Sequence, residues 1–483
     1  MSMIVPKSLL SDEQKTFLKI CCTYAYDPTD KHRMKYKEKL DTLVNIDPVA
    51  IKFAQQAFFQ ERSEMMKKYL GRKAYDYHDN PTDDKPPILF YVCLPNGDFI
   101  LPYALSRIIL KKNLNFERSF PKIDLKFTGQ LREDQPGFCK TMISHLESSG
   151  TTTMAVCTGE GKTAMGAYLS CWGELITCVL ISIKPLIKQW VSTFETFTTA
   201  RLADSSIWVV SDEQPEDINK VKVLICMEER MSKINPLLVN RIGTVIIDEA
   251  HRFCVPSMIG CWLFFQPRYL IVETATVERV DDQMERVIYA AAGLWNVFKK
   301  STKVFPVIKI ETKIKGVRSS GKRGINYTKL IQSILYEENN IIDKLILEIL
   351  RQNPGKKTLI LTKETKHINN MVEYLGNLGI KSSPFYGDME TYEGSKILIG
   401  TAGKIGTGFD EATFDENFDG TKLEVMVFCN TVRKFDTLQQ NVGRIRHDAP
   451  IIYIMVHDDP IFKDHWRLMS WWFENYTSAK VIV

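Results

Sequence analysis

The sequence predicts an α/β protein in which two parallel-sheet domains follow each other, preceded by an N-terminal α+β module. Short apolar runs alternate with helical stretches from about residue 121, and the same alternation restarts near residue 357. This rhythm is typical of parallel strands joined by covering helices. The chain has 483 residues, which is too long for one ordinary hydrophobic core, so two or three domains are expected.

The N-terminal module is expected over residues 1–120. Residues 31–39 and 48–70 have helical patterning, whereas residues 79–87 are polar and rich in proline. The prolines predict a loop at that point. The next segment, ILFYVCLPNGDFIL, predicts two strands around a Pro-Asn-Gly-Asp turn.

The first α/β domain is expected over residues 121–300 and the second over residues 301–483. The join, roughly residues 301–327, is rich in Lys, Arg, Gly and Ser and predicts a hinge. Nine apolar runs are predicted to be strands. They are residues 151–156, 175–183, 222–227, 243–248 and 269–274 in the first domain, and 357–362, 396–401, 424–430 and 451–456 in the second.

The composition narrows the class of protein. Hydrophobic residues make up 44% and charged residues 25%, a balance that excludes a disordered or fibrous chain. The longest apolar runs are strand-sized, and the N-terminus lacks the pattern of a secretion signal, so we expect an intracellular protein without a membrane partner. The 11 cysteines show no C-x-x-C spacing and predict buried thiols in a reducing compartment. A net charge of +5 is too small to establish a nucleic-acid partner.

A glycine-rich loop is the sharpest local motif. It reads Cys157-Thr158-Gly159-Glu160-Gly161-Lys162-Thr163 and lies between an apolar strand and a helical run. Glycines let a tight loop point backbone N–H groups at phosphate oxygens. Lys162 is then expected to reach the β- and γ-phosphates, and the Thr163 hydroxyl to bind Mg²⁺. Val156 replaces the first glycine of the full phosphate-loop pattern, so a plain glycine-rich turn is the alternative.

A second motif, Asp248-Glu249-Ala250-His251, follows the strand at residues 243–248. A carboxylate at the end of a buried strand is well placed to bind Mg²⁺ beside a phosphate loop. We therefore assign Asp248 as a metal ligand and Glu249 as the residue that polarises the attacking water. An acidic cap at a helix N-terminus is the alternative for these residues.

With these two motifs, residues 126–450 resemble the superfamily 2 helicases and translocases. Leu131 to Gln135 resembles the Q motif, which implies that Gln135 contacts adenine. The segment from Lys184 to Trp190, KPLIKQW, is similar to motif Ia, which implies that Lys184 and Lys188 contact nucleic acid. Thr274-Ala275-Thr276 resembles motif III, which implies that Thr274 and Thr276 couple hydrolysis to movement. Val277 stands in place of the usual proline.

The second domain carries two further resemblances. Residues 401–410, TAGKIGTGFD, resemble motif V, which implies that Thr401 and Lys404 contact nucleic acid and that Gly408 and Asp410 contact the nucleotide. Residues 440–444, QNVGR, resemble motif VI, which implies that Arg444 neutralises charge on the γ-phosphate. The second arginine of this motif falls on His447, and Arg446 lies one place earlier. Arg446 replaces it only if the local helix turns by about a third of a turn.

The strings LRxxQ, KPLIKQW, TATxxRxD and GTGxD are most similar to the DNA translocases related to the XPB repair helicase. Within that branch they resemble the helicases of large cytoplasmic DNA viruses, such as the poxvirus transcript-release helicase. The resemblance implies two RecA-like lobes, ATP and Mg²⁺ as cofactors in the cleft between them, and movement along DNA. It also implies transcription or repair proteins as partners, and the virion or host cytoplasm as the location.

Three other functions stay open. The same motor can act on RNA, or it can translocate on duplex as a subunit of a larger restriction or remodelling complex. Val277 and His447 raise a third alternative, a scaffold whose ATPase has decayed. A scaffold has no need of the five residues that carry hydrolysis. These are Lys162, Thr163, Asp248, Glu249 and Arg444.

Two stretches have competing structural interpretations. The basic run from Lys309 to Arg323 either contacts a nucleic-acid backbone or forms a flexible linker. The aromatic residues Trp466, Trp471, Trp472 and Phe473 are expected to pack as an amphipathic helical face, with base stacking as the alternative.

Overall fold

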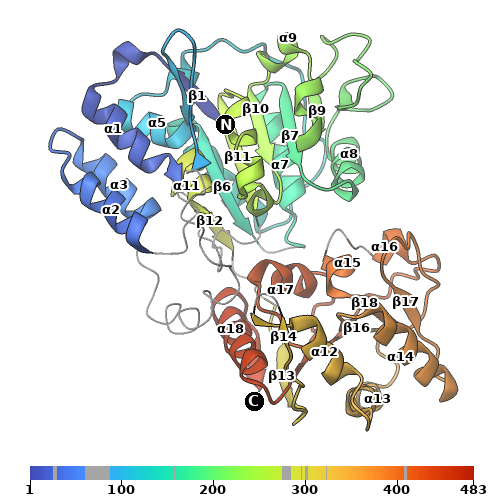
Figure 1. Cartoon of the computed structure of the whole chain (residues 1–483). Helices are drawn as coiled ribbons and strands as arrows, with labels where there is room; N and C mark the ends of the chain where they lie inside the picture. The colour runs from blue at the N-terminus through green and yellow to red at the C-terminus, as the bar shows by residue number, and fades with distance from the viewer. Residues whose placement is uncertain are drawn as a thin grey trace. The chain divides into compact units, whose positions relative to one another are not determined.

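The computed structural model describes residues 1–24, 30–59, 88–156, 159–274, 284–294, 296–299, 303–321, 324–406, 409 and 411–482. The chain divides into two compact units. The first contains Met1–Ser63, Asn80–Val156 and Glu160–Phe298, and the second consists mainly of Lys299–Val483. Each unit is built around one seven-stranded sheet (Figure 1). The prediction of two α/β domains in tandem is confirmed.

The first sheet has the order β12-β6-β11-β10-β7-β9-β8. Its strands from β6 to β8 pair in parallel, as alternation with helices predicts. All five apolar runs predicted in this region contain a strand. The bounds are β6 Thr151–Val156, β7 Thr177–Ile181, β8 Ile207–Val209, β9 Val223–Met227, β10 Thr244–Ile247, β11 Tyr269–Thr274 and β12 Asn296–Lys299.

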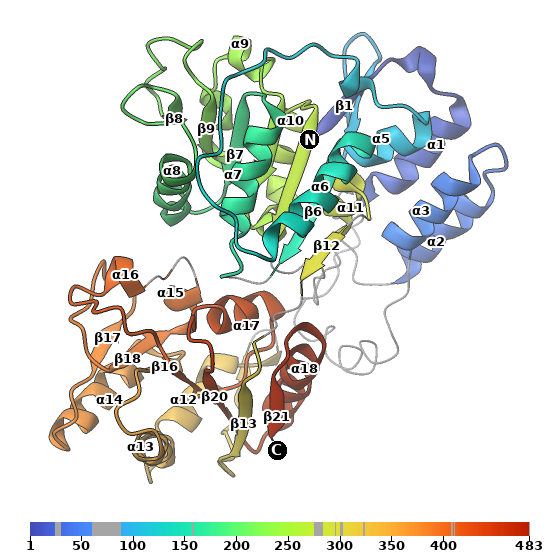
Figure 2. The same cartoon turned by 180° about the vertical axis from the view of Figure 1, so that it is seen from behind.

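Helices cover one face of this sheet. They are α6 (Gln135–Ser149), α7 (Lys162–Gly173) and α8 (Pro185–Phe197), seen in front of the strands in Figure 2. Alternate strand residues, such as Val179 and Ile181, pack with these helices in one core cluster. Their neighbours Cys178 and Leu180 belong to the cluster on the opposite face, because side chains alternate across a strand.

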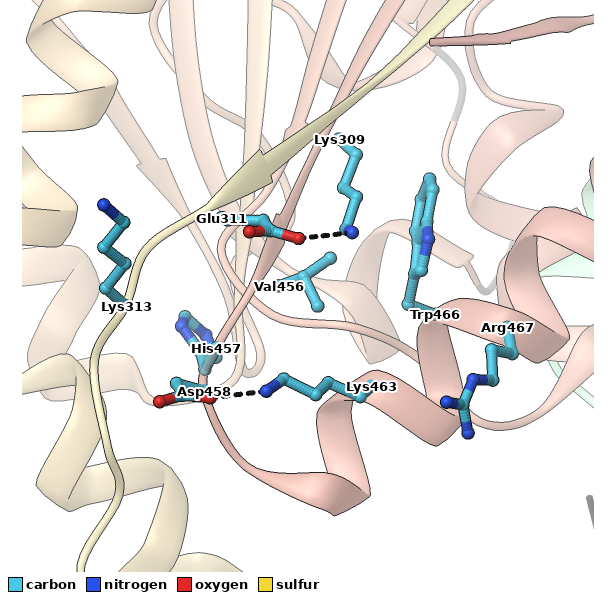
Figure 3. A pocket seen from close by; sticks show the side chains of 9 residues that line it. All are labelled: Lys309, Glu311, Lys313, Val456, His457, Asp458, Lys463, Trp466 and Arg467. Carbon is cyan, nitrogen blue, oxygen red and sulfur yellow. Dashed lines mark hydrogen bonds and ion pairs between the residues drawn. The ribbon is translucent and has the colours of Figure 1, made fainter. Parts of the chain in front are cut away.

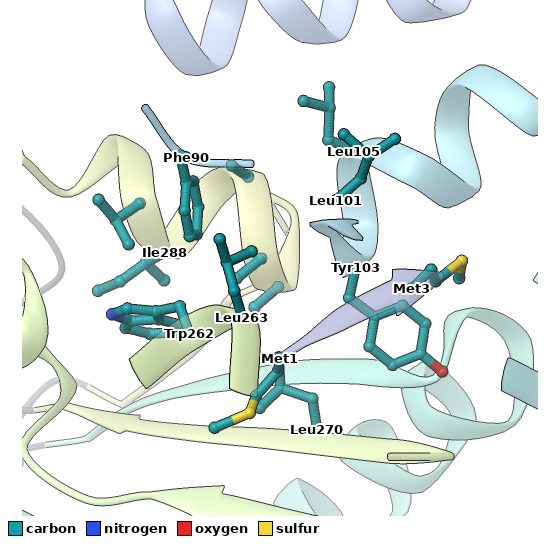
Figure 4. Packing of buried hydrophobic residues seen from close by; sticks show 14 of the residues in the cluster. Met1, Met3, Phe90, Leu101, Tyr103, Leu105, Trp262, Leu263, Leu270 and Ile288 are labelled. Atoms are coloured by element: carbon teal, nitrogen blue, oxygen red, sulfur yellow. The ribbon is translucent and has the colours of Figure 1, made fainter. Parts of the chain in front are cut away.

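The N-terminal residues complete that opposite face. They form β1 (Ser2–Val5), α1 (Asp12–Cys21), α2 (Asp30–Asp41), α3 (Pro48–Phe58), β4 (Val92–Cys93), β5 (Phe99–Pro102) and α5 (Tyr103–Leu110). Met1, Met3, Phe90 and Leu101 pack among side chains of the first α/β domain, including Trp262 and Ile288 (Figure 4). The N-terminal segment therefore shares a hydrophobic core with the sheet that it covers.

Hydrogen bonds reinforce this junction. Asn115 Nδ2 donates to the carbonyls of Ser2 and Pro267 at 2.9 and 2.8 Å, and Tyr103 Oη donates to the carbonyl of Arg268 at 2.6 Å. The predicted hairpin is also present, because β4 and β5 pair antiparallel around a turn at Gly97. The predicted loop at residues 79–87 lies outside the described residues.

On the same side lie three short helices, α9 (Pro236–Val239), α10 (Cys261–Phe264) and α11 (Arg286–Ala292). Helix α11 contributes Val287, Ile288 and its three alanines to the core that it shares with the N-terminal residues. The small alanines allow close approach of α5, which lies against α11 in both views.

The second sheet has the order β17-β18-β16-β19-β20-β13-β21, with all six neighbouring pairs parallel. The four runs predicted here contain β16, β18, β19 and β20. The strands are β13 Pro306–Glu311, β16 Thr358–Thr362, β17 Ser383–Phe385, β18 Ile397–Thr401, β19 Val425–Phe428, β20 Ile451–Val456 and β21 Lys480–Ile482. The stretch expected as a hinge, 301–327, thus contains β13, which pairs on both sides.

Helices α12 (Tyr327–Leu335), α13 (Ile341–Gln352) and α14 (Thr365–Asn377) pack on one face of the second sheet. The remaining helices of this unit are α15 (Ala402–Gly406), α16 (Glu411–Phe414), α17 (Phe435–Val442) and α18 (Pro460–Tyr476). Trp472 and Phe473 of α18 are buried, and Trp471 stacks on Phe435 with ring centroids 5.5 Å apart. The predicted amphipathic packing of these aromatic residues is confirmed.

Within the described residues, no helix has both the length and the apolar character needed to cross a bilayer. The ten described cysteines are all free; eight of them are buried as predicted, Cys261 is half-buried and Cys93 is exposed. The described part of the chain holds no group of three or more His, Cys, Asp or Glu side chains able to bind a metal ion on their own.

Candidate nucleotide site and nucleic-acid interface

The glycine-rich loop joins β6 to α7, as the motif predicts. Gly159 and Gly161 have φ values of +88° and +81°, a backbone region that favours glycine. A Cβ atom on Gly161 would in addition clash with the Gln135 side chain. Lys162 is the first residue of α7, and its largely buried ammonium donates to the carbonyl of Val156 at 3.2 Å. Thr158 lies outside the described residues.

Gln135, at the start of α6, is tied to this loop. Its Oε1 accepts a hydrogen bond from the Arg132 N–H at 2.9 Å, and its Nε2 donates to the Glu160 carbonyl at 3.0 Å. The side chain is 3% exposed. Gln135 therefore supports the conformation of the loop, and its contact with adenine stays a prediction.

Asp248 lies directly after β10, at the carboxyl edge of the sheet where the loop also lies. The Glu249 N–H donates to Asp248 Oδ1 at 2.8 Å, and Trp190 Nε1 donates to Asp248 Oδ2 at 2.8 Å. Glu249 itself has a φ of +50°, which is uncommon for a residue with a side chain and is typical of strained functional sites. It precedes the short helix Ala250–Phe253.

The site concentrates negative charge in a buried place. Burial, and then the charge of Glu249, raise the pKa of Asp248 to about 6, whereas Lys162 and the Trp190 hydrogen bond act in the opposite direction. Burial and the charge of Asp248 also raise the pKa of Glu273 well above its ordinary value. Glu273 is the penultimate residue of β11, and neither of its carboxylate oxygens has a hydrogen-bond partner among the described residues. A bound cation would relieve this excess of negative charge.

The donor set fits Mg²⁺. The Thr163 hydroxyl and the Asp248 carboxylate supply the oxygen ligands that this ion prefers, and it commonly takes further ligands from water and substrate phosphates. Gln189 Nε2 donates to Thr163 Oγ1 at 2.9 Å. That bond leaves the second lone pair of the hydroxyl oxygen available to a metal ion.

The predicted coupling residue Thr274 contacts the second motif. His251 Nδ1 lies 3.2 Å from Thr274 Oγ1 and 3.4 Å from Glu249 Oε2. His251 thus bridges the predicted water-polarising residue and the end of β11. Thr276 and Val277 lie outside the described residues.

The segment that resembles motif Ia has two faces. Lys184 and Lys188 are exposed at the first turn of α8, as expected of residues that contact nucleic acid. The next two residues, Gln189 and Trp190, instead reach the phosphate-loop threonine and Asp248. The resemblance predicted a role for the two exposed lysines, but it did not predict the contacts of Gln189 and Trp190.

In the second unit, Arg444 follows the end of α17. Its guanidinium donates to the carbonyls of Gly406 and Phe409 at 2.6 and 3.2 Å. The structure therefore brings the arginine of the motif VI segment to the motif V segment. Thr401 ends β18 and accepts a hydrogen bond from the Lys404 N–H at 3.3 Å, and the Lys404 ammonium lies over the Phe385 ring. Gly408 and Asp410 lie outside the described residues.

The condition set for Arg446, a helix that turns by about a third of a turn, is not met in the described residues. Helix α17 ends at Val442, so the residues that follow do not share its turn angle. Arg446 is exposed, and Lys303 Nζ donates to the carbonyls of Arg446 and His447 at 3.2 and 3.1 Å. Non-helical backbone, held by Lys303, sets the directions of both side chains.

The basic run from Lys309 to Arg323 is partly structural. Its first residues line a pocket of about 320 Å³. Figure 3 shows how Lys309 pairs with Glu311 and Lys463 pairs with Asp458 in this pocket. Arg318 donates two hydrogen bonds to Asp459, at 2.7 and 2.9 Å. Asp459 in turn caps α18. Lys309 and Arg318 therefore stabilise the second unit, and the interpretation as a flexible linker is wrong for them.

The chain is similar in sequence to one protein family and to several viral proteins. Residues 128–279 match the family described as "Type III restriction enzyme, res subunit". The putative helicase 161L of Invertebrate iridescent virus 6 is 26% identical over 82% of this chain and 92% of its own. The transcript termination protein A18 of fowlpox virus is 22% identical over 71% of this chain and 74% of its own. The putative ATP-dependent RNA helicase L396 of Acanthamoeba polyphaga mimivirus is 22% identical over 77% of this chain and 74% of its own.

Two parallel-sheet units, a phosphate loop and these relatives define a helicase of superfamily 2, an enzyme that hydrolyses ATP and binds nucleic acid. Within that class, the chain is most similar to helicases of large DNA viruses.

Proposed function

We propose that this helicase moves along DNA and acts in viral transcription, with Mg²⁺·ATP bound at the carboxyl edge of the first sheet. The observation that carries the proposal is the meeting of α7, α8 and β10 around Asp248. Lys162 and Trp190 both act on that carboxylate, the first through its charge and the second through a 2.8 Å hydrogen bond. The name of the fowlpox relative, a transcript termination protein, supports the role in transcription.

Each residue has a defined task in this proposal. The ammonium of Lys162 exchanges the Val156 carbonyl for phosphate oxygens, while the N–H groups at the start of α7 face the same anion. Thr163 and Asp248 hold Mg²⁺, which neutralises phosphate charge when it is bound. Glu249 orients and polarises the attacking water. Arg444 supplies positive charge to the transferred phosphoryl group.

Nucleic acid is proposed to bind through its phosphates. Lys184 and Lys188 are exposed at the N-terminus of α8, where the helix dipole also favours an anion. In the second unit, Thr401 and Lys404 are proposed to contact the same strand. Because such contacts read the backbone and not the base edges, we expect little dependence on sequence.

ATP hydrolysis measured with no polymer, single-stranded DNA, duplex DNA and RNA tests the proposal. We expect stimulation by DNA, and loss of turnover in Lys162→Ala. Lys140→Ala, an exposed lysine on α6, is the control and should behave as the unmodified enzyme. Unchanged turnover in Lys162→Ala would overturn the assignment of the site.

Two observations favour alternative substrates. The mimivirus relative is named as an RNA helicase, and stimulation by RNA above DNA in the same assay would select that function. The matching family is described as a restriction-enzyme subunit, which favours translocation on duplex without strand separation. Displacement of a third strand from a triplex, together with no unwinding of a duplex, would select that function.

A further inference from the structure

Helix α8 contacts both residues that are proposed to hold Mg²⁺. Gln189 Nε2 donates to Thr163 Oγ1 at 2.9 Å, and Trp190 Nε1 donates to Asp248 Oδ2 at 2.8 Å. The two donors are consecutive in sequence and follow the exposed Lys188 directly. One helix therefore carries exposed lysines suited to phosphates and, on another side, the donors that hold two proposed metal ligands.

These hydrogen bonds restrict the ligands without blocking them. The Thr163 oxygen keeps its own proton and one lone pair after it accepts from Gln189. Asp248 accepts one N–H on each oxygen, from Glu249 and from Trp190, so rotation of the carboxylate would break both bonds. The geometry of the metal ligands therefore depends on where α8 lies.

Trp190 leaves α8 little freedom to move by itself. Its side chain is fully buried, and a Cβ atom on Gly166 of α7 would lie 2.9 Å from Trp190 Cη2 and would clash with Glu273 Oε1. Glycine at position 166 lets α7, the Trp190 ring and the end of β11 pack directly on one another. Close-packed interiors transmit displacements, so a shift of α8 reaches Asp248.

We propose that α8 couples nucleic-acid binding to ATP hydrolysis, with Gln189 and Trp190 as positioning residues for Thr163 and Asp248. The inference rests on the proposed function, since it assumes that nucleic acid binds at Lys188 and that the metal ion binds at Asp248. In this coupling, polymer bound at the exposed lysines acts on α8, and the Gln189 amide and the buried Trp190 ring transmit that effect to both metal ligands.

Two variants with matched controls test the coupling. Trp190→Phe keeps the ring and removes the N–H donor, and Gln189→Ala removes an exposed side chain that folding does not need. Trp262→Phe removes another fully buried indole, which donates to the Phe253 carbonyl at 3.1 Å. Gln214→Ala removes another exposed amide, which donates to the Lys233 carbonyl at 2.7 Å.

For each variant we would measure the ratio of polymer-stimulated to basal ATP hydrolysis, its dependence on Mg²⁺ concentration, the Kd for polymer, and Tm. In Trp190→Phe and Gln189→Ala we expect the ratio to fall about tenfold, with more Mg²⁺ needed for half-maximal rate and Kd unchanged. The two controls should keep the ratio of the unmodified enzyme. An unchanged ratio in Gln189→Ala, or an equal fall in Trp262→Phe and Gln214→Ala, would overturn the coupling.

Failure of the proposed function gives a different result. If the site does not hydrolyse ATP, Lys162→Ala keeps its turnover. If the site is correct and only the coupling is wrong, Lys162→Ala is inactive while Gln189→Ala is still stimulated by polymer.

Discussion

The surroundings of Glu273 predict how the stability of the first unit changes with pH. The side chain is fully buried next to the proposed nucleotide site, and neither carboxylate oxygen has a hydrogen-bond partner within the described residues. Burial, followed by the negative charge of Asp248, raises its pKa well above the ordinary value of 4.5. The folded protein therefore keeps this proton at pH values where the unfolded chain has lost it.

The sign of the pH dependence follows from that difference. The stability associated with protonated Glu273 is fully present below pH 4.5, and it is lost as the pH rises toward the folded-state pKa. Each pH unit in this range lowers the free energy of unfolding by about 1.4 kcal/mol. Glu273→Gln is neutral at every pH, so its stability relative to the unmodified protein should increase by that amount per unit.

Thermal unfolding of the first unit over a series of pH values above 4.5 measures this effect. For a unit of this size, about 1.4 kcal/mol corresponds to roughly 3 to 6 °C in Tm, so the Tm advantage of Glu273→Gln should grow by about that much per pH unit. Glu147→Gln, an exposed glutamate on α6, changes the same charge and should show no such growth. A Tm difference that stays constant with pH in Glu273→Gln would refute the reasoning.

Three further predictions concern other parts of the chain. Gly161→Ala should raise the KM for ATP about tenfold or more, because a side chain at φ +81° is strained and clashes with Gln135. Gly137→Ala, whose Cβ would meet nothing within 4 Å, should leave KM unchanged, and equal KM values in the two variants would contradict this. In the second unit, burial lowers the pKa of His457 from 6.5 to about 4. As the pH falls from 6.5 to about 4, the free energy of unfolding of this unit should fall by about 1.4 kcal/mol per pH unit through this residue. Urea unfolding of His457→Gln should show a smaller fall, and an equal fall in the variant would argue against this role. Arg318→Lys should destabilise the second unit by about 1 kcal/mol, because lysine cannot make the two-point contact with Asp459. An unchanged urea midpoint would show that this ion pair contributes nothing.

Local patterns in the sequence predicted the parts of the fold that depend on local information. The runs at residues 151–156 and 451–456 match β6 and β20 residue for residue, because buried parallel strands are rich in apolar and β-branched residues, which include the three threonines of β6. Strand β13 was missed, since Lys309 and Glu311 give it the charge of a linker while they pair with each other on the sheet surface. Only the strands on both sides of β13 reveal it as part of the sheet.

The site divides in the same way. Motifs that are continuous in sequence predicted the loop residues Lys162 and Thr163 and the acidic pair Asp248 and Glu249. Contacts between residues that are far apart in sequence could not be predicted in this way. Trp190 and Asp248 are 58 residues apart, and nothing in the local pattern of α8 indicates that its indole reaches this carboxylate. In the sequence, Glu273 is only the penultimate residue of a strand. Its carboxyl is buried beneath α7, without a hydrogen-bond partner among the described residues, and only the packed fold shows this.

We propose that nucleic acid controls ATP hydrolysis by the first unit. Steady-state ATP hydrolysis with and without saturating single-stranded DNA, in the unmodified enzyme and in Glu249→Gln, is the measurement that decides this. We expect strong stimulation by DNA in the unmodified enzyme and its loss in the variant, with DNA binding retained. Stimulated hydrolysis that persists in Glu249→Gln would rule out the proposed site.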